Sequence, residues 1–481
     1  MRRKGHCGFD RLTSICHNAI LLQNETGGMM SFLGKQGPIF RYRYVILAVL
    51  TTCYTIQWLD RVTAPTLMPF VSKDLGFSTA EQGLGVALMM VLYGLSQWAT
   101  GWLCDKIGSR KILLFSVISW SLLTAWMANM HTATEWYIRM AVFGVLIGTE
   151  LVPSARLLVR WFPPRQRAEA QSVLSWAWIV TPAWAPLVAA ALYSGLGDNW
   201  RLVFTILAVA GSIPLLLILF FVFDRPEQCR WASPQDVKDA YEDELASGVI
   251  TAADFEGGRP GHLEQKAKSC AITFQQIVGT RGYLPLIIVY IFAQQIIWGV
   301  LTWSPQYLTQ VHHFKVMEMG AWACVYFIGG AMGSFLSSWI SDKFMGGRRK
   351  PMIVMAFAGA LPFVLALAFM GRGVPPALLL LALTGAGFFS NMVWGPAMSI
   401  PADMFPAEVY GKALGFTVCC AYVLAAACPY IMGALIFSDP ATGAKSYTGA
   451  WIYVACAIIG GVIAALFLPE HKPRSARIGA K

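Results

Sequence analysis

The sequence is poor in charged residues. Only 13% of its 481 residues are Asp, Glu, Lys or Arg, about half the share found in soluble domains. By contrast, 56% of the residues are hydrophobic. So few charges cannot cover the surface of a water-soluble fold of this size, and the composition therefore indicates a chain that lies largely within a lipid bilayer.

Motifs of common enzymes and nucleotide-binding proteins are also absent. There is no GxSxG, HExxH or HxH pattern, and the stretch 443–446 lacks the upstream glycine and the Gly-Lys pair of a Walker A loop. The 11 cysteines form no CxxC pair. The only combination for a metal, at 6–7 and 16–17, lies in a short Gly-containing stretch. These absences argue against an enzyme, ATP-driven transport, a metal site and a bound cofactor.

The net charge of +11 does not indicate a nucleic-acid partner, because the basic residues occur in short clusters between apolar segments. If the N-terminus is cytoplasmic, the inner side carries 30 of the 37 Lys and Arg residues and the outer side 5. Such a bias predicts that both termini lie in the cytoplasm.

Long apolar segments account for most of the chain. Residues 202–223 and 449–469 contain no charge at all, and a bilayer-spanning helix needs roughly 20 such residues. We predict an all-α membrane protein with twelve transmembrane helices at 44–70, 80–104, 110–129, 135–160, 170–195, 201–223, 283–310, 319–341, 351–371, 376–400, 408–437 and 449–468.

The only long polar stretch inside the chain divides these helices six and six. We expect a disordered cytoplasmic tail at 1–43 and a second cytoplasmic tail at 469–481. Between them we predict one six-helix bundle at 44–223, a cytoplasmic linker at 224–282 with a short surface helix near 234–246, and a second bundle at 283–468.

The two halves repeat each other. The stretch GWLCDKIGSRK at 101–111 follows the second predicted helix, and SWISDKFMGGRRK at 338–350 follows the eighth. A Phe-Pro pair follows helices four and ten, at 162–163 and 405–406. Two different motifs thus recur in the second half at nearly the same separation in sequence, which indicates a parallel duplication of a six-helix unit.

The stretch 101–111 resembles the signature loop of the major facilitator superfamily. Glycine permits close helix approach, an aspartate can accept bonds from a helix N-terminus, and basic residues hold the inner face. The resemblance implies a conformational latch rather than a substrate site. Its residues would be Gly101, Asp105, Gly108, Arg110 and, in the second copy, Asp342.

A closer resemblance is to the anion:cation symporter branch of that superfamily, which includes sialin-like, hexuronate, aldonate and phthalate carriers. Stretches at 58–62, 153–167, 199–204, 302–308 and 401–406 resemble its motifs in order and at matching depth. The resemblance implies alternating access in a monomer that takes up a small organic anion with protons. A proton gradient would supply the energy, and membrane lipid would surround the protein.

Four charged residues of the first half are expected within the hydrocarbon region, away from the ends of the predicted helices: Asp60, Arg61, Arg139 and Glu150. A charge in the hydrocarbon region costs roughly 2.5 kcal/mol or more, so it usually has a partner or a function. We expect Arg61 to bind a substrate carboxylate, Asp60 and Glu150 to exchange protons, and Arg139 to pair with one ionised acid. A charge cluster that only holds helices together is the alternative.

The resemblance also implies a pocket lined by Tyr93, Gln294 or Gln295, and Asn391 with Trp394. Two cysteines, at 419–420, occupy a region where the branch usually has an asparagine, and the fifth helix carries three tryptophans at 176, 178 and 184. Both a sugar acid and an aromatic carboxylate therefore stay open as ligands.

Two function classes besides proton symport stay open. An uncoupled facilitator or anion exchanger would have the same fold, and its flux would not respond to pH. A membrane-embedded enzyme or sensor is the third class, against which the missing motifs argue. The compact loops favour the inner membrane of a bacterium.

Overall fold

A computed structural model describes most of the chain. The described residues are 41–240, 274–345, 348–371, 373–405, 407–438 and 445–470. The predicted tails, apart from their innermost residues, and the linker between 241 and 273 lie outside them, as do the two His-Cys pairs near the N-terminus.

The first half of the described chain is helical throughout. Its elements in chain order are α2 (Tyr42–Leu75), α3 (Thr79–Ile107), α4 (Ser109–Met127), α5 (Ala133–Ile147), α6 (Leu151–Trp161), α7 (Pro164–Val180), η1 (Thr181–Ala183), α8 (Ala185–Gly195), α9 (Trp200–Ala210), α10 (Ser212–Phe221), η2 (Pro226–Gln228) and α11 (Pro234–Ala240).

The second half repeats this pattern. It contains α15 (Phe274–Val278), α16 (Tyr283–Gln310), α17 (Val316–Lys343), α18 (Lys350–Phe369), α19 (Pro376–Met392), α20 (Trp394–Met404), α21 (Ala407–Ala425), α22 (Ala427–Leu435) and α23 (Thr448–Leu466). A two-residue hairpin, β1 (Phe437–Ser438) with β2 (Lys445–Ser446), lies between α22 and α23.

Ten helical segments among the described residues are long and apolar enough to cross a membrane, and the bent pair α7 and α8 makes an eleventh. Helix α2 has 34 residues, which is ample for a crossing, and supplies the twelfth. Large apolar side chains such as Trp98, Leu122 and Phe369 are exposed along these helices. Such a surface suits contact with lipid.

Prolines explain why several spans consist of two helices. A proline has no N–H and cannot bond to the carbonyl four residues earlier, so the helix breaks there. Pro153 follows the break between α5 and α6, and Pro396 follows the break between α19 and α20. These two prolines are 243 residues apart, the same offset as the repeated Phe-Pro pairs, so the duplication extends to the bends of the helices.

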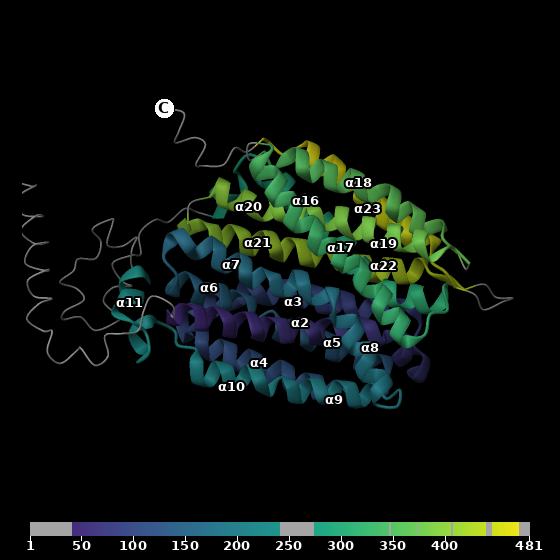
Figure 1. Ribbon diagram of the computed structural model, residues 1–481, viewed down its shortest axis with the longest axis horizontal. Helices are drawn as coiled ribbons and strands as arrows, with labels where there is room; N and C mark the ends of the chain where they lie inside the picture. The colour runs from purple at the N-terminus through teal and green to yellow at the C-terminus, as the bar shows by residue number, and fades with distance from the viewer. Residues whose placement is uncertain are drawn as a thin grey trace, which may run out of the picture.

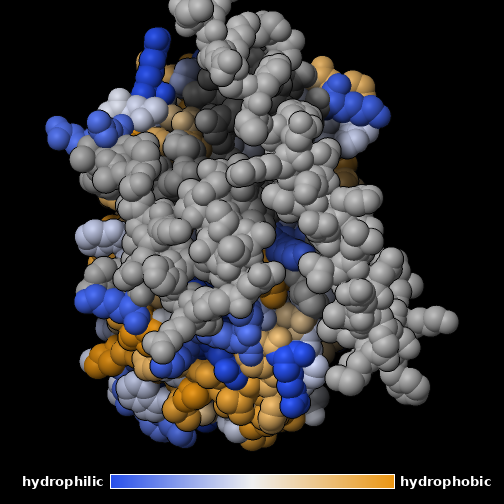
Figure 2. All heavy atoms as spheres, turned by 90° about the vertical axis from the view of Figure 1, so that its left-hand side faces the viewer, coloured by the Kyte–Doolittle hydropathy of each residue, from blue (hydrophilic) through white to orange (hydrophobic). Residues whose placement is uncertain are grey.

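Each half forms one bundle, and the two bundles lie side by side (Figure 1). Helices α2 to α10 make up the first bundle and α16 to α23 the second. Helix α11 lies at the left-hand end of the view, which we call the terminal side. Hydrophilic residues gather on this side (Figure 2).

The bundles touch closely at the opposite end, which we call the far side. The amide of Gln306 in α16 donates a hydrogen bond to Gln82 in α3. Thr79 Oγ1 donates to the carbonyl of Gly433 at 2.9 Å. A Cβ atom on Gly83 would collide with the carbonyl of Pro429, so the missing side chain permits the approach. The far side is therefore closed in this structure.

Candidate functional site

Arg61 lies deep between the two bundles, in a ring of aromatic side chains. The guanidinium carbon is 4.1 Å from the ring centre of Tyr93, 4.7 Å from Trp58, 4.8 Å from Trp298 and 5.7 Å from Tyr422. We call these four rings the aromatic cage. Trp58 and Tyr93 come from the first bundle, and Trp298 and Tyr422 from the second.

The cation of Arg61 has no anionic partner in the part of the chain that the structure describes. Its side chain is 1% exposed, and none of its three nitrogens has a hydrogen-bond acceptor. Cation–π contacts are worth about 0.5–2 kcal/mol each and stabilise the charge in part. They leave the N–H groups of the guanidinium without an acceptor, so these donors can still bind an anionic group.

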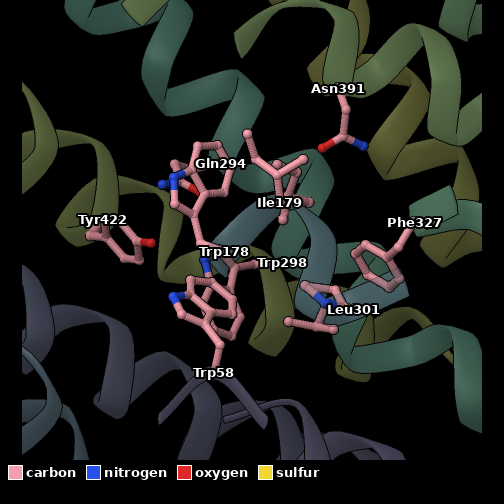
Figure 3. A pocket seen from close by; sticks show the side chains of 11 residues that line it. Trp58, Trp178, Ile179, Gln294, Trp298, Leu301, Phe327, Asn391 and Tyr422 are labelled. Atoms are coloured by element: carbon pink, nitrogen blue, oxygen red, sulfur yellow. The ribbon is translucent and has the colours of Figure 1, made fainter. Parts of the chain in front are cut away.

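A small cavity adjoins the aromatic cage, between the bundles. Its volume is about 30 Å³, about the space that one water molecule takes up in the liquid. Trp58, Trp298 and Tyr422 belong to both the cage and the cavity wall, so these rings lie between Arg61 and the cavity. The remaining lining residues are Trp178, Ile179, Pro182, Gln294, Ile297, Leu301, Phe327 and Asn391 (Figure 3).

Only some of the residues expected to line the pocket do so in the structure. Gln294 and Asn391 do line the cavity, whereas Tyr93 lies against Arg61. Trp394 supports the wall from behind, with its ring 5.6 Å from that of Trp178 in a T-shaped arrangement. Gln295 points away from the cavity, because its Oε1 lies 3.5 Å from the hydroxyl of Tyr453 in α23.

Three cage residues were missed by sequence reasoning: Trp58, Trp298 and Tyr422. A helical spacing could have identified two of them. Trp58 is three residues before Arg61, and Trp298 is four residues after Gln294, so each shares a helix face with a residue already singled out. Tyr422 had no such signal, because it reaches the cage only through the packing of α21 against α3.

The two buried acids, Asp60 and Glu150, lie apart from Arg61, inside the first bundle. Asp60 is 3% exposed, and its Oδ2 accepts a hydrogen bond of 3.0 Å from Thr124 in α4. Glu150 is fully buried, and neither of its oxygens has a hydrogen-bond donor. The carboxyl groups of Asp60 and Glu150 lie within electrostatic range of each other. We call Asp60 and Glu150 the acid pair.

Glu150 lies at the break in the fourth span, directly before α6. The carbonyls released by this break find other donors: Gln57 Nε2 bonds to the carbonyl of Ile147 at 3.0 Å, and Ser116 Oγ to that of Leu146 at 3.3 Å. Helices α2 and α4 thus hold the break in place. The break itself sets Glu150 beside the middle of α2, where Asp60 lies.

Arg139 does not meet either member of the acid pair. Its Nη2 forms an ion pair of 2.6 Å with Glu135, one turn earlier in α5. The same guanidinium donates to the carbonyls of Trp126 and Asn129 at the end of α4. The expected pairing of Arg139 with Asp60 or Glu150 is therefore not the one observed, because α5 begins with an acid one turn from the arginine.

The signature loop at 101–111 holds α4 against the end of α10. Gly108 has φ +97°, a conformation that favours glycine. The backbone N–H of Arg110 donates to Asp224 Oδ1 at 3.0 Å, and its guanidinium donates to the carbonyl of Leu219 at 2.6 Å. Gly101 lies in α3, where a Cβ atom would lie 4.0 Å from Cγ1 of Val152. The side chains of Asp105 and Asp342 lie outside the described part.

Among the described residues, no group of three or more His, Cys, Asp or Glu side chains could hold a metal ion.

The family model described as Major Facilitator Superfamily matches residues 50–345 and 286–481. The chain belongs to the major facilitator superfamily. Its similarity to a solved bacterial homologue of the human lysosomal transporter Spinster, in an inward-facing and occupied conformation, has a TM-score of 0.69. That match covers 89% of this chain and 96% of the other, at 16% identity. The all-α membrane fold predicted from the sequence is thereby confirmed.

Curated relatives of this major facilitator protein are named as organic-anion transporters. "Probable galactarate/D-glucarate transporter GarP" of Escherichia coli (strain K12) is 25% identical over 439 residues, or 89% of this chain and 94% of GarP. "Probable sulfoacetate transporter SauU" of Cupriavidus necator is 24% identical over 368 residues, or 75% of this chain and 80% of SauU. These names agree with the anion:cation symporter branch, and the protein is a transporter, not an enzyme.

Proposed function

We propose that the protein takes up a small organic anion together with protons. The observation that carries this proposal is the separation of two charged features within one bundle. Arg61 lies at the interface of the bundles with its N–H groups unused, and the acid pair lies inside the first bundle without a cationic partner among the described residues. One feature suits an anion and the other suits protons.

The anion would bind where the aromatic cage meets the central cavity. A carboxylate or sulfonate matches the fork of N–H donors on a guanidinium. The indole N–H groups of Trp58 and Trp298 are also buried without acceptors and supply two further donors. Relatives named for galactarate and sulfoacetate support an anionic cargo.

The acid pair would carry the protons. Two carboxyl groups in mutual electrostatic range, buried and without a cation, favour neutral forms over two negative charges. Ionisation on one side of the membrane and protonation on the other would then accompany the rocking of the two bundles. A proton gradient would be the only energy source, with no bound cofactor.

A facilitator or exchanger without proton coupling is the second candidate. Arg61 and the acid pair share no hydrogen bond or ion pair among the described residues, so an anion could be bound and released while the acids stay protonated. Coupling would require that the state of the acid pair alter the packing of α2, which carries both Asp60 and Arg61.

We infer that the protein lies in the inner membrane of a bacterium, as a monomer, with both termini in the cytoplasm. Hydrophilic residues gather on the terminal side (Figure 2), and the junction of α3 and α4 carries Lys106, Arg110 and Lys111. This bias matches the excess of Lys and Arg on the cytoplasmic side of membrane proteins.

Uptake into proteoliposomes tests the proposal. Labelled galactonate, phthalate and benzenesulfonate would be offered with an imposed pH gradient, alkaline inside, and again after an ionophore has abolished it. Symport predicts accumulation of at least one anion above equilibrium only while the gradient lasts, and none in protein-free liposomes. An identical time course with and without the gradient would favour the facilitator or exchanger.

A further inference from the structure

The wall of the central cavity is mostly apolar. Ile179, Pro182, Ile297, Leu301 and Phe327 contribute hydrocarbon surface, and three indoles add the faces of aromatic rings. In Figure 3 the tryptophans gather in the middle of the view, and Leu301 and Phe327 lie to the right of them. The cavity thus resembles a pocket for an apolar molecule more than one for a polyol.

The wall contains few polar groups, and some of these already form hydrogen bonds within the protein. Asn391 Nδ2 already donates to the carbonyl of Gly387 at 3.0 Å. Gln294 lies within hydrogen-bonding range of the Tyr422 hydroxyl. Beyond these three side chains, only the indole N–H groups of the lining tryptophans offer hydrogen bonds, and those of Trp58 and Trp298 lie next to Arg61.

The positive charge and most of the free hydrogen-bond donors of the site therefore belong to a few neighbouring residues. Donors and positive charge gather at Arg61, Trp58 and Trp298, where an anionic group would be held. Leu301 and Phe327, which are not among the four rings around Arg61, give the cavity apolar surface. A ligand that fits this pattern has its charge at one end and a body that needs no hydrogen bonds.

We propose that the substrate is a small monoanion with an apolar, planar body, such as an aromatic carboxylate or sulfonate, and that polyhydroxylated sugar acids are poor ligands. This inference rests on the proposed function, because it assumes that an organic anion occupies the cavity. It separates this chain from the relatives that are named for galactarate and D-glucarate.

A sugar acid and an aromatic anion of equal charge differ in the free energy of burying their uncharged parts in this cavity. Each hydroxyl of a sugar acid that is buried without a partner costs about 1–3 kcal/mol, and the wall offers few partners for four or five hydroxyls. An aromatic body instead gains about 25 cal/mol for each Å² of apolar surface buried, with a further contribution from ring contacts to Trp58, Trp178 or Phe327. Both terms favour the aromatic anion.

The cavity must widen to admit either ligand, since it has a volume of about 30 Å³ here. Its wall is shared between bundles: Trp58 and Trp178 belong to the first, and Trp298, Phe327 and Asn391 to the second. Because each bundle contributes part of this wall, movement of the bundles would change the size of the cavity.

Calorimetric binding to the purified full-length protein tests the inference. Benzoate and gluconate carry the same charge at pH 7, and cyclohexanecarboxylate matches benzoate in size without an aromatic ring. We expect the Kd of benzoate to be at least tenfold below that of gluconate, with cyclohexanecarboxylate between them. The Arg61→Gln variant should weaken the binding of benzoate.

A pair of matched variants examines the wall itself. Phe327→Leu should reduce the preference for benzoate over cyclohexanecarboxylate. Phe363→Leu, which alters an aromatic pair with Phe389 outside the cavity lining, should leave that preference unchanged.

The outcomes separate the inference from the proposed function. If gluconate binds as tightly as benzoate or tighter, and Arg61→Gln abolishes this binding, the inference is overturned and anion transport stands. If neither these anions nor galactonate or a sulfonate binds in a way that depends on Arg61, the proposed function fails and the inference fails with it.

Discussion

Asp60 and Arg61 are neighbours in α2, yet their side chains lie in different environments. Asp60 accepts a hydrogen bond from Thr124 inside the first bundle, whereas the guanidinium of Arg61 lies among aromatic rings from both bundles. One helix thus carries a carboxyl group and a cation that do not neutralise each other. Any shift or rotation of α2 moves both groups together, which is a physical basis for coupling protons to an anion.

Arg61 is expected to control anion affinity. The Arg61→Gln variant removes the charge and leaves a shorter, neutral polar side chain, so charge-assisted hydrogen bonds worth about 1.5–3 kcal/mol are lost. Affinity for the transported anion should fall about 10- to 100-fold. Arg201→Gln is the matched control, because Arg201 is 35% exposed and pairs with Asp74 at the far side. Equal affinities of the two variants would contradict the assignment of Arg61.

Arg139 is expected to act on stability more than on proton coupling. Its guanidinium ties α5 to the end of α4 through Glu135 and two carbonyls. Arg139→Gln should lower the temperature at which the detergent-solubilised protein unfolds, while the ratio of accumulated to external anion at a fixed pH gradient stays near that of the wild type. Loss of accumulation in a variant of normal stability would instead place Arg139 in the proton pathway.

Because the two bundles pack closely at the far side, the addition of one methyl group there should loosen their contact. Gly83→Ala introduces a Cβ that collides with the backbone of Pro429 in the other bundle, so the far side should open more often. Gln306, fully buried behind this contact, would become accessible. Mass spectrometry of a Gln306→Cys variant after treatment with an impermeant maleimide measures this. Gly415→Ala, which meets open space, should leave labelling unchanged, and equal labelling in both variants would refute the prediction.

The short helix α11 is fastened to the start of α2 by a buried ion pair. Arg43 and Asp239 lie 2.9 Å apart, with side chains 2% and 7% exposed. Removing one partner of such a pair costs about 3–5 kcal/mol, so Arg43→Ala should destabilise the protein clearly. Arg41 binds the same carboxylate but is 38% exposed, and Arg41→Ala should cost about 1 kcal/mol at most. Thermal unfolding of both variants checks this ranking.

The architecture could be predicted from the sequence because its signals are local. Apolar runs fix the number of spans, and the repeated marks at 101–111 and 338–350 reveal the duplication. The break between α5 and α6, at residues 148–150, was less apparent, although Pro153 marks it. A proline removes one hydrogen bond from its helix, but the side chains that donate to the released carbonyls come from other helices.

The site could be predicted only in part. Asp60, Arg61 and Glu150 stand out because charge is rare in a membrane span. The partners of these groups depend on packing between helices far apart in sequence, as with Thr124 for Asp60 and Tyr422 for Arg61. Arg139 was paired with the wrong acid for a different, local reason: Glu135, one turn earlier in α5, forms the ion pair with its guanidinium.

Gradient-driven accumulation by Asp60→Asn and Glu150→Gln proteoliposomes tests the central claim most directly. Each variant would be assayed for accumulation under a pH gradient and for exchange of labelled anion at equal concentration and pH on both sides. We predict that at least one variant loses accumulation yet continues to exchange, because the anion site at Arg61 is intact while the proton site is lost. Full accumulation by both variants would contradict the claim that the acid pair couples protons to the anion.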